Sequence, residues 1–301
     1  MLKRFMPLLF VVLVVLATAV IYLVFRDSDT PAPAQPAATA PVTREPGVAA
    51  DGLPEYRVES EAEYQRALEA LGTSTDEIEA WARSRGFPPA TYTSAPGTPL
   101  ARNYARERIP RLRELAEEGD RWAMHFLAER IHPEHPQEGI EWYRQSIVRG
   151  SAYSAFKLGA LYRDVARWIA ISGDDREEVL EIAAQEDPLA YSSLGWLLVA
   201  EYEAGLPPGA IAATLVGLHA HDEGIERSCE RAAGFLEDIR ALREELGIEL
   251  PSRPPPLAVE LPPEEVAGYC DPEVFPRADF SDCETVRFSG DLGSVLAHRC
   301  R

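Results

Sequence analysis

Lysine is nearly absent from this chain of 301 residues, because only Lys3 and Lys157 occur among its 30 basic residues. Options for lysine-based chemistry are therefore few. Positive charge as a whole is also scarce: the formal net charge is −19, and residues 174–301, with 10 basic and 27 acidic side chains, carry −17 of it. This balance argues against a nucleic-acid partner, since binding to phosphates requires a basic surface.

Cysteine is limited to Cys229, Cys270, Cys283 and Cys300, and the absence of any Cys-x-x-Cys pair argues against a zinc site. An even number of cysteines in an exported chain favours disulfides. Four cysteines allow three pairings, and the sequence does not choose among them. We favour Cys270–Cys283, which would close a local loop, together with Cys229–Cys300, which would fix the chain end to a helix.

One long apolar segment lies near the N-terminus, where residues 7–25 form an uncharged, mostly apolar run behind Lys3 and Arg4. As a helix it would span roughly 28 Å, close to the hydrocarbon thickness of a bilayer. We expect residues 1–26 to be a single-pass inner-membrane anchor, with the N-terminus cytoplasmic and the bulk of the chain periplasmic. A cleaved signal peptide is the alternative, because Ala17-Thr18-Ala19 has the small-x-small form of a cleavage site.

The rest of the chain divides into three parts. Residues 27–54 are rich in proline and alanine and too poor in large side chains to pack, so we expect a tether. Residues 55–246 show helical spacing, and capping-box patterns at 60–63 and 74–77 mark the first two helix starts. Prolines interrupt residues 247–301, which predicts an irregular tail stapled by disulfides, with a short strand as its only regular element.

A short pattern recurs within the helical part. A small residue and then a leucine follow a glycine at four-residue steps, first after Gly119 and, 31 residues later, after Gly150 (Ala123 and Leu127; Ser154 and Leu158). Small residues at this spacing share one helix face, where a neighbouring helix can approach closely. The recurrence predicts a solenoid of stacked helices at about 120–131, 137–149, 151–171, 175–185, 188–204, 208–220 and 222–246.

This pattern resembles the Sel-one-like repeat, a relative of the tetratricopeptide repeat, over residues 115–205. The resemblance implies an all-α fold, a right-handed superhelix of paired helices. It also implies a non-catalytic scaffold or adaptor for protein–protein interaction in the bacterial cell envelope, with an unidentified envelope protein as its partner. The alternative function is an envelope hydrolase or a peptidoglycan-binding protein that uses the tail or the N-terminal helical region.

Catalytic motifs are mostly missing: the chain has no His-Glu-x-x-His, no Gly-x-Ser-x-Gly, no phosphate-binding loop and no dinucleotide fingerprint. Ser154 and Lys157 match the Ser-x-x-Lys form of serine penicillin-interacting enzymes. However, Ser154 stands at the small-residue position of the repeat, where it would face a neighbouring helix, and no further lysine can supply the Lys-Thr-Gly motif of those enzymes. We expect no catalytic residue and no cofactor.

Two histidine pairs, His132 with His135 and His219 with His221, are candidate metal ligands. No third ligand accompanies the first pair in the sequence. The i,i+2 spacing of the second pair would send the two rings to different faces of a helix. We expect solvated polar helix ends rather than a metal site.

The arginines gather between Pro99 and Glu118, where Pro110 is expected to kink or restart a helix. The members of this group are Arg102, Arg106, Arg108, Arg111 and Arg113. They would form either a solvated helix face or a contact with an acidic partner, with anionic lipid headgroups or with the chain's own acidic second half. We take them as the candidate partner contact.

Overall fold

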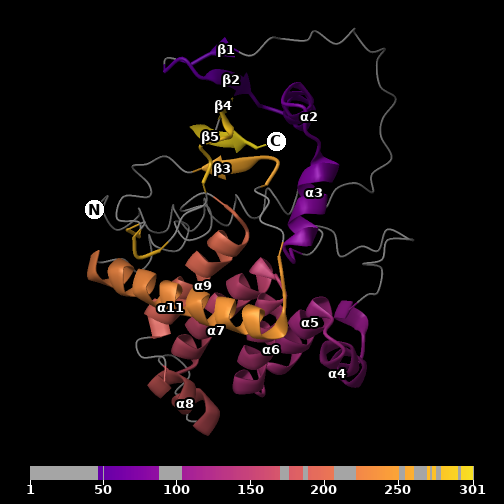
Figure 1. Ribbon diagram of the computed structural model, residues 1–301, viewed down its shortest axis with the longest axis vertical. Coiled ribbons are helices and arrows are strands. Elements are labelled where there is room, and N and C mark those ends of the chain that lie inside the picture. Colours follow the sequence, from indigo (N-terminus) through magenta and orange to yellow (C-terminus); the bar gives the residue numbers. More distant parts are fainter. Residues whose placement is uncertain are drawn as a thin grey trace, which may run out of the picture.

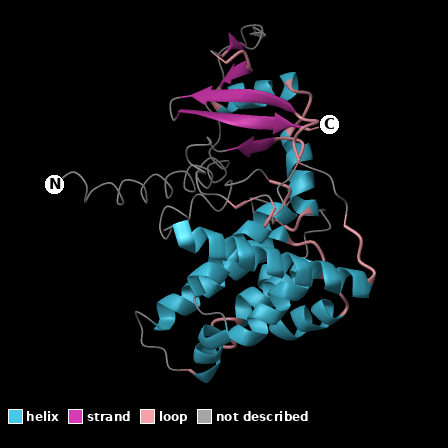
Figure 2. Ribbon diagram, turned by 60° about the vertical axis from the view of Figure 1, so that its left-hand side comes forward, coloured by secondary structure: helices cyan, strands magenta, loops and turns pink. Residues whose placement is uncertain are grey.

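The structure is a computed structural model that describes residues 47–49, 51–87, 104–169, 176–185, 189–206, 222–250, 255–260, 270–271, 273–275, 279–290 and 293–300. A stack of helices lies at one end, and a five-stranded sheet lies at the other (Figures 1 and 2). The predicted all-α fold class is therefore wrong. Two seven-residue strands at 284–290 and 293–299 pair with each other, and shorter strands at 54–57 and 258–260 join them from other parts of the sequence.

The single transmembrane helix in the predicted fold class is not supported either. Within the described ranges no helix is both long enough and apolar enough to cross a membrane. Residues 1–26, where the anchor was expected, lie outside the described residues. The predicted tether at 27–54 is wrong at its end, since residues there form strand β1 (Gly47–Val48) and the start of strand β2 (Pro54–Arg57).

The helical stack agrees closely with the predicted spans. Its helices are α4 (Ile109–Glu117), α5 (Arg121–Ile131), α6 (Pro136–Val148), α7 (Ala152–Arg167), α8 (Glu177–Gln185), α9 (Leu189–Glu203) and α11 (Asp222–Leu246). A short 3-10 helix, η3 (Tyr104–Arg106), precedes α4, and Pro110 lies in the first turn of α4, as a restarted helix requires. The helix expected at 208–220 lies outside the described residues.

The recurring glycines end helices in the same way. Gly119 after α4 and Gly150 after α6 have positive φ, 94° and 87°. The amide after each glycine bonds a carbonyl of the preceding helix, Asp120 to Leu115 at 3.0 Å and Ser151 to Ser146 at 3.1 Å, which is the Schellman arrangement. Asp120 and Ser151 then cap the next helices, α5 and α7. The 31-residue period is thus a repeated cap, turn and cap.

The small residues of the pattern lie where helices approach each other. Ala123 is fully buried. A Cβ added to Gly159 on α7 would lie 2.8 Å from the carbonyl oxygen of Ser193 on α9, and the Ser193 hydroxyl donates to the Gly159 carbonyl at 2.7 Å. Only glycine allows that approach.

The sheet has the strand order β1-β2-β4-β5-β3, completed by β3 (Ala258–Glu260), β4 (Glu284–Gly290) and β5 (Gly293–Arg299). The β2–β4 pair is parallel, and the other pairs are antiparallel. Helices α2 (Glu61–Ala70) and α3 (Thr75–Ser84) start at the predicted caps, Ser60 and Ser74. Side chains of α2 pack against β4 and β5 in a separate core formed by Leu68, Leu71, Val286, Phe288 and Ala297. We call the sheet with α2 and α3 the sheet unit.

The described part of the C-terminal tail forms strands at 258–260, 284–290 and 293–299, so the prediction of an irregular tail at 247–301 is wrong. After α11 it forms β3 in the sheet unit, and it then returns to the stack, where Cys270 and Phe275 are buried in the helical core. Phe275 packs edge-on against Tyr202 of α9 at 5.9 Å between ring centroids. The chain next enters the sheet again as β4 and β5. The tail therefore joins the two parts of the molecule.

All four cysteines form disulfides, as predicted, but the favoured pairing is wrong. Cys229 of α11 bonds Cys270, with Cα atoms 5.5 Å apart, and Cys283 bonds Cys300, with Cα atoms 4.5 Å apart. The reason is tertiary. Cys270 packs with α11 in the helical core, whereas Cys283 and Cys300 flank the two antiparallel strands of one hairpin.

Candidate functional site

The Ser-x-x-Lys motif lies on α7, and Ser154 has no exposed surface. Its hydroxyl oxygen lies 2.9 Å from Nδ1 of His125 on α5, and 2.8 and 2.9 Å from the hydroxyls of Ser146 and Ser151. A serine beside a histidine is the geometry of an activated nucleophile. Here both side chains are fully enclosed, so no substrate reaches them, and the network connects α5 with α7 and the end of α6.

His125 is neutral at physiological pH, because burial lowers its pKa to about 4. The rings of Phe126, Tyr143 and Tyr153 surround it at 5.1 to 5.6 Å between centroids. Its second ring nitrogen, Nε2, has no hydrogen-bond partner in the part of the chain that the structure describes. A neutral ring in an apolar cage fits this position better than an imidazolium would.

Lys157 is half-buried, and its ammonium donates to the Glu129 carboxylate of α5 at 2.6 Å. Burial by itself would lower the Lys157 pKa, but the bonds to Glu129 and Tyr153 outweigh it and raise the pKa. Burial likewise works to raise the pKa of Glu129, but the charge and hydrogen bond of Lys157 lower it. Both groups are therefore charged and paired, which suits an ion pair between helices and not a general base.

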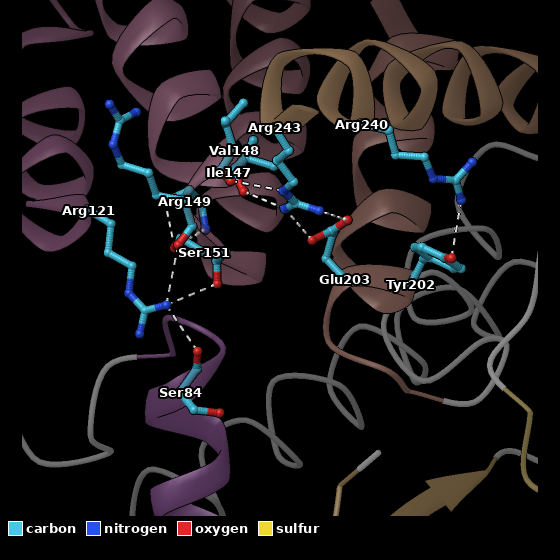
Figure 3. Close-up of polar contacts among 12 residues, drawn as sticks. Ser84, Arg121, Ile147, Val148, Arg149, Ser151, Tyr202, Glu203, Arg240 and Arg243 are labelled. Carbon is cyan, nitrogen blue, oxygen red and sulfur yellow. Dashed lines mark hydrogen bonds and ion pairs between the residues drawn. The ribbon is translucent and has the colours of Figure 1, made fainter. Parts of the chain in front are cut away.

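A group of arginines lies where the ends of α3, α6 and α9 meet (Figure 3). Arg121, the first residue of α5, donates to the carbonyls of Arg83 and Ser84 at the end of α3, at 2.9 and 3.0 Å. The same guanidinium reaches the carbonyls of Gly150 and Arg149 after α6, at 3.4 and 3.5 Å. One side chain thus contacts the ends of two helices that are remote in sequence.

Arg243 of α11 completes the group (Figure 3). Its guanidinium donates to the carbonyls of Ile147 and Val148 at 2.8 and 2.9 Å and forms a two-pronged ion pair with Glu203 of α9. The last carbonyls of a helix have no partner within it and carry negative partial charge, so guanidinium ions are favourable there. We call Arg85, Arg121, Arg243 and Glu203 the arginine junction.

The electrostatics of the arginine junction follow from burial and from like charge. Burial lowers the pKa of Arg121. The charge of Asp120 works to raise this pKa, and the like charge of Arg85 works to lower it. Burial also lowers the pKa of Arg85. The negative charge of Glu203 works to raise this pKa, and the positive charge of Arg243 works to lower it. Guanidinium ions nevertheless remain charged in proteins. Carbonyl groups at helix ends and Glu203 therefore compensate several half-buried positive charges.

The arginines of the predicted partner contact differ in their surroundings. Arg106 and Arg108 are exposed, and no ion pair joins either of them to another described residue. Arg111 pairs with Glu114 of its own helix at 2.8 Å, and Arg113 pairs with Glu138 of α6. Arg102 lies outside the described residues. Two of the five predicted arginines thus serve contacts within the stack.

The predicted histidine pairs are not brought together as a metal site within the described ranges, where no group of three or more metal-ligating side chains occurs. His132 is half-buried, with Nδ1 3.1 Å from the Ala128 carbonyl, and His135 is exposed. His219 and His221 lie outside the described residues.

Reasoning from the sequence missed the arginine junction entirely. Arg121 is 37 and 38 residues from its partners on α3, and Arg243 is 95 and 96 residues from its partners at the end of α6. An arginine beside a helix start carries no signal that it will cap two other helices. No protein-family model matches the chain, and no curated protein or solved structure matches it either.

Proposed function

We propose that the chain is a non-catalytic scaffold or adaptor for protein–protein interaction in the cell envelope. The observation that carries this proposal is the helical stack, in which a repeated cap, turn and cap place successive helices side by side. The most reactive side chains of the stack, those of Ser154, His125 and Lys157, are engaged in contacts between its own helices. Such a stack offers an extended surface that needs no reactive site.

The compartment belongs to the same proposal. Two disulfides bond all four cysteines, one in the helical core and one across the hairpin. Disulfides persist in oxidising compartments and are rare in the cytosol. This supports placing the folded part outside the cytoplasm, facing the periplasm.

The proposed partner contact is the pair Arg106 and Arg108, immediately before α4. Both side chains are exposed, while Arg111 and Arg113 next to them are engaged with glutamates. An arginine that has no ion pair breaks no existing interaction when a partner binds to it. Its charge also attracts acidic groups over about 10 Å. We therefore propose a protein partner with an acidic surface.

Crosslinking in intact cells, followed by pull-down of the full chain, tests the proposal. The parent should capture a discrete partner, and Arg106→Glu/Arg108→Glu should reduce its yield roughly tenfold, as expected when attraction becomes repulsion. The matched control is Arg57→Glu/Arg66→Glu, which makes the same change of charge on exposed arginines of the sheet unit.

Equal loss of the partner in both double variants would show that net charge matters and not this site. A folded parent chain that captures no protein would contradict the scaffold function. Release of fragments from peptidoglycan by the purified chain would instead favour the alternative function, an envelope hydrolase.

A further inference from the structure

Among the described residues, the core of the sheet unit shares no buried residue with the two cores of the helical stack. The core of the sheet unit contains Leu68 and Phe288, and the helical cores contain residues of α4 to α11 with the returning tail. Helix α3 extends from the sheet unit towards the stack (Figure 1), and its last turn contacts the stack at the start of α7. The end of α3 is therefore a second connection between the sheet unit and the stack, beside the C-terminal tail, which crosses between them.

The contacts at that end are close and combine a backbone hydrogen bond with aromatic packing. The Ala152 amide, at the start of α7, donates to the Arg85 carbonyl at 2.8 Å. Gly86 has positive φ, 79°, and a Cβ added to it would lie 2.5 Å from the Ser151 hydroxyl. Phe87 packs against Tyr153 at 5.7 Å between ring centroids. Residues 83–87 thus cover the first turn of α7.

We propose that residues 83–87 are a latch, closed over the first turn of α7 by Arg121, which opens without unfolding either core. In the closed state Arg121 holds the Arg83 and Ser84 carbonyls beside those of Arg149 and Gly150. Opening would leave these carbonyls and the Ala152 amide to water, which replaces the lost hydrogen bonds. A small junction held by backbone hydrogen bonds and one aromatic contact separates more readily than an extended apolar core does.

This inference is independent of the proposed function, since it concerns how the two parts of one chain are coupled. Opening would uncover the α7 turn that carries Ser151 and Tyr153, next to the enclosed His125 and Ser154. Arg121 is accordingly a positioning residue.

Hydrogen exchange of the full chain, resolved to single residues, tests the latch. The Ala152 amide is the reporter, because its acceptor is the Arg85 carbonyl. Arg121→Gln should speed its exchange roughly tenfold, while amides of β4, β5 and the second half of α7 keep the parent rates. Arg121→Lys, which keeps the charge but lacks the fork of donors, should give an intermediate rate. Arg149→Gln is the matched control, since the Arg149 side chain bonds Gln145 of its own helix.

A second pair of variants opens the latch without changing any charge. Gly86→Ala forces a Cβ into Ser151, whereas Gly247→Ala, also at a glycine of positive φ, meets nothing within 4 Å. Both place an alanine at a positive φ, so faster exchange at Ala152 in Gly86→Ala alone would support the latch.

Unchanged Ala152 exchange in both Arg121→Gln and Gly86→Ala would overturn the proposal. So would a uniform increase over α7, β4 and β5, because the junction would then serve global stability and not a local opening. An effect of Arg149→Gln equal to that of Arg121→Gln would also count against it.

Discussion

The helical stack and the sheet unit differ in how far apart in the sequence their contacting elements lie. In the stack, α4 packs against α5, α5 against α6, α6 against α7, and α7 most extensively against α9, so most helices pack against one that is one or two elements away in sequence. In the sheet unit, Glu55 of β2 pairs with Arg287 of β4, which joins the two ends of the described chain. The structure of a region that is organised by local contacts can be predicted from its sequence, whereas the pairing of remote strands cannot.

The stack contains one buried ion pair, whereas the ion pair of the hairpin in the sheet unit is partly exposed. Arg243 and Glu203 in the stack have side chains that are 14% and 7% exposed. Arg299 and Glu284, which pair within the hairpin of the sheet unit, are 18% and 48% exposed. Breaking a buried ion pair leaves a charge without compensation in the protein interior. When an exposed ion pair is broken, water solvates the remaining charge. The stack should therefore depend on its ion pair more strongly than the sheet unit does.

The largest expected effect comes from the Arg243→Met variant. It leaves Glu203 buried without its partner and the Ile147 and Val148 carbonyls without their donor. We expect a loss of about 3–5 kcal/mol in the free energy of unfolding, measured by urea denaturation. Arg299→Met is the matched variant of the sheet unit and should cost about 1 kcal/mol or less. Equal losses would contradict the contrast between the regions.

The disulfides give a second, smaller contrast. Removing Cys229–Cys270, with a sequence separation of 41, should cost about 4 kcal/mol by the chain-entropy relation. Removing Cys283–Cys300, with a separation of 17, should cost about 3 kcal/mol.

Paired cysteine-to-alanine variants, compared by denaturation of the full chain, measure both losses. Because Cys229 and Cys270 are buried in the helical core and the other two are half-buried, mild reductant should also open Cys283–Cys300 first. Alkylation and mass spectrometry would show the order. Initial opening of Cys229–Cys270 would mean that the tail is not held in the stack as described.

The smallest of the three effects is the pH dependence due to His125. Its pKa is lowered from an ordinary 6.5 to about 4 in the folded chain, so below pH 6.5 the unfolded chain binds the additional proton. The contribution of neutral His125 to the free energy of unfolding is therefore fully present above pH 6.5 and is lost as the pH falls towards 4. Between pH 7 and pH 5 we expect His125 to contribute a loss of about 2 kcal/mol.

A non-titrating variant isolates that contribution. His125→Gln keeps an amide near Ser154 but binds no proton in this range, so its stability should fall less steeply from pH 7 to pH 5. Equal slopes for the parent and the variant would show that the His125 pKa is not lowered in the folded chain. Exposed His135, changed to glutamine, serves as the control for loss of a histidine without burial.

The predictions from sequence succeeded where structure is local. The starts of α2 and α3 at Ser60 and Ser74 were confirmed, because a capping side chain acts within three residues. The same holds for the stack, where helix spans match within a few residues. For the candidate site the outcome is uneven, since the burial of Ser154 was predicted and the arginine junction was not. Nothing near Arg121 in the sequence indicates the α3 carbonyls that it contacts.

By itself the sequence determined where helices of the stack begin and end, why Gly119 and Gly150 recur, and which small residues lie between helices. These features depend on backbone conformation and on hydrogen bonds within a turn. Only the tertiary structure decided the sheet, the partners of Cys270 and Cys283, and the contacts of Arg121. Strands of three or four residues, such as β3 and β2, are too short for an alternating pattern, and pairing across the chain is settled by which surfaces the whole fold brings together.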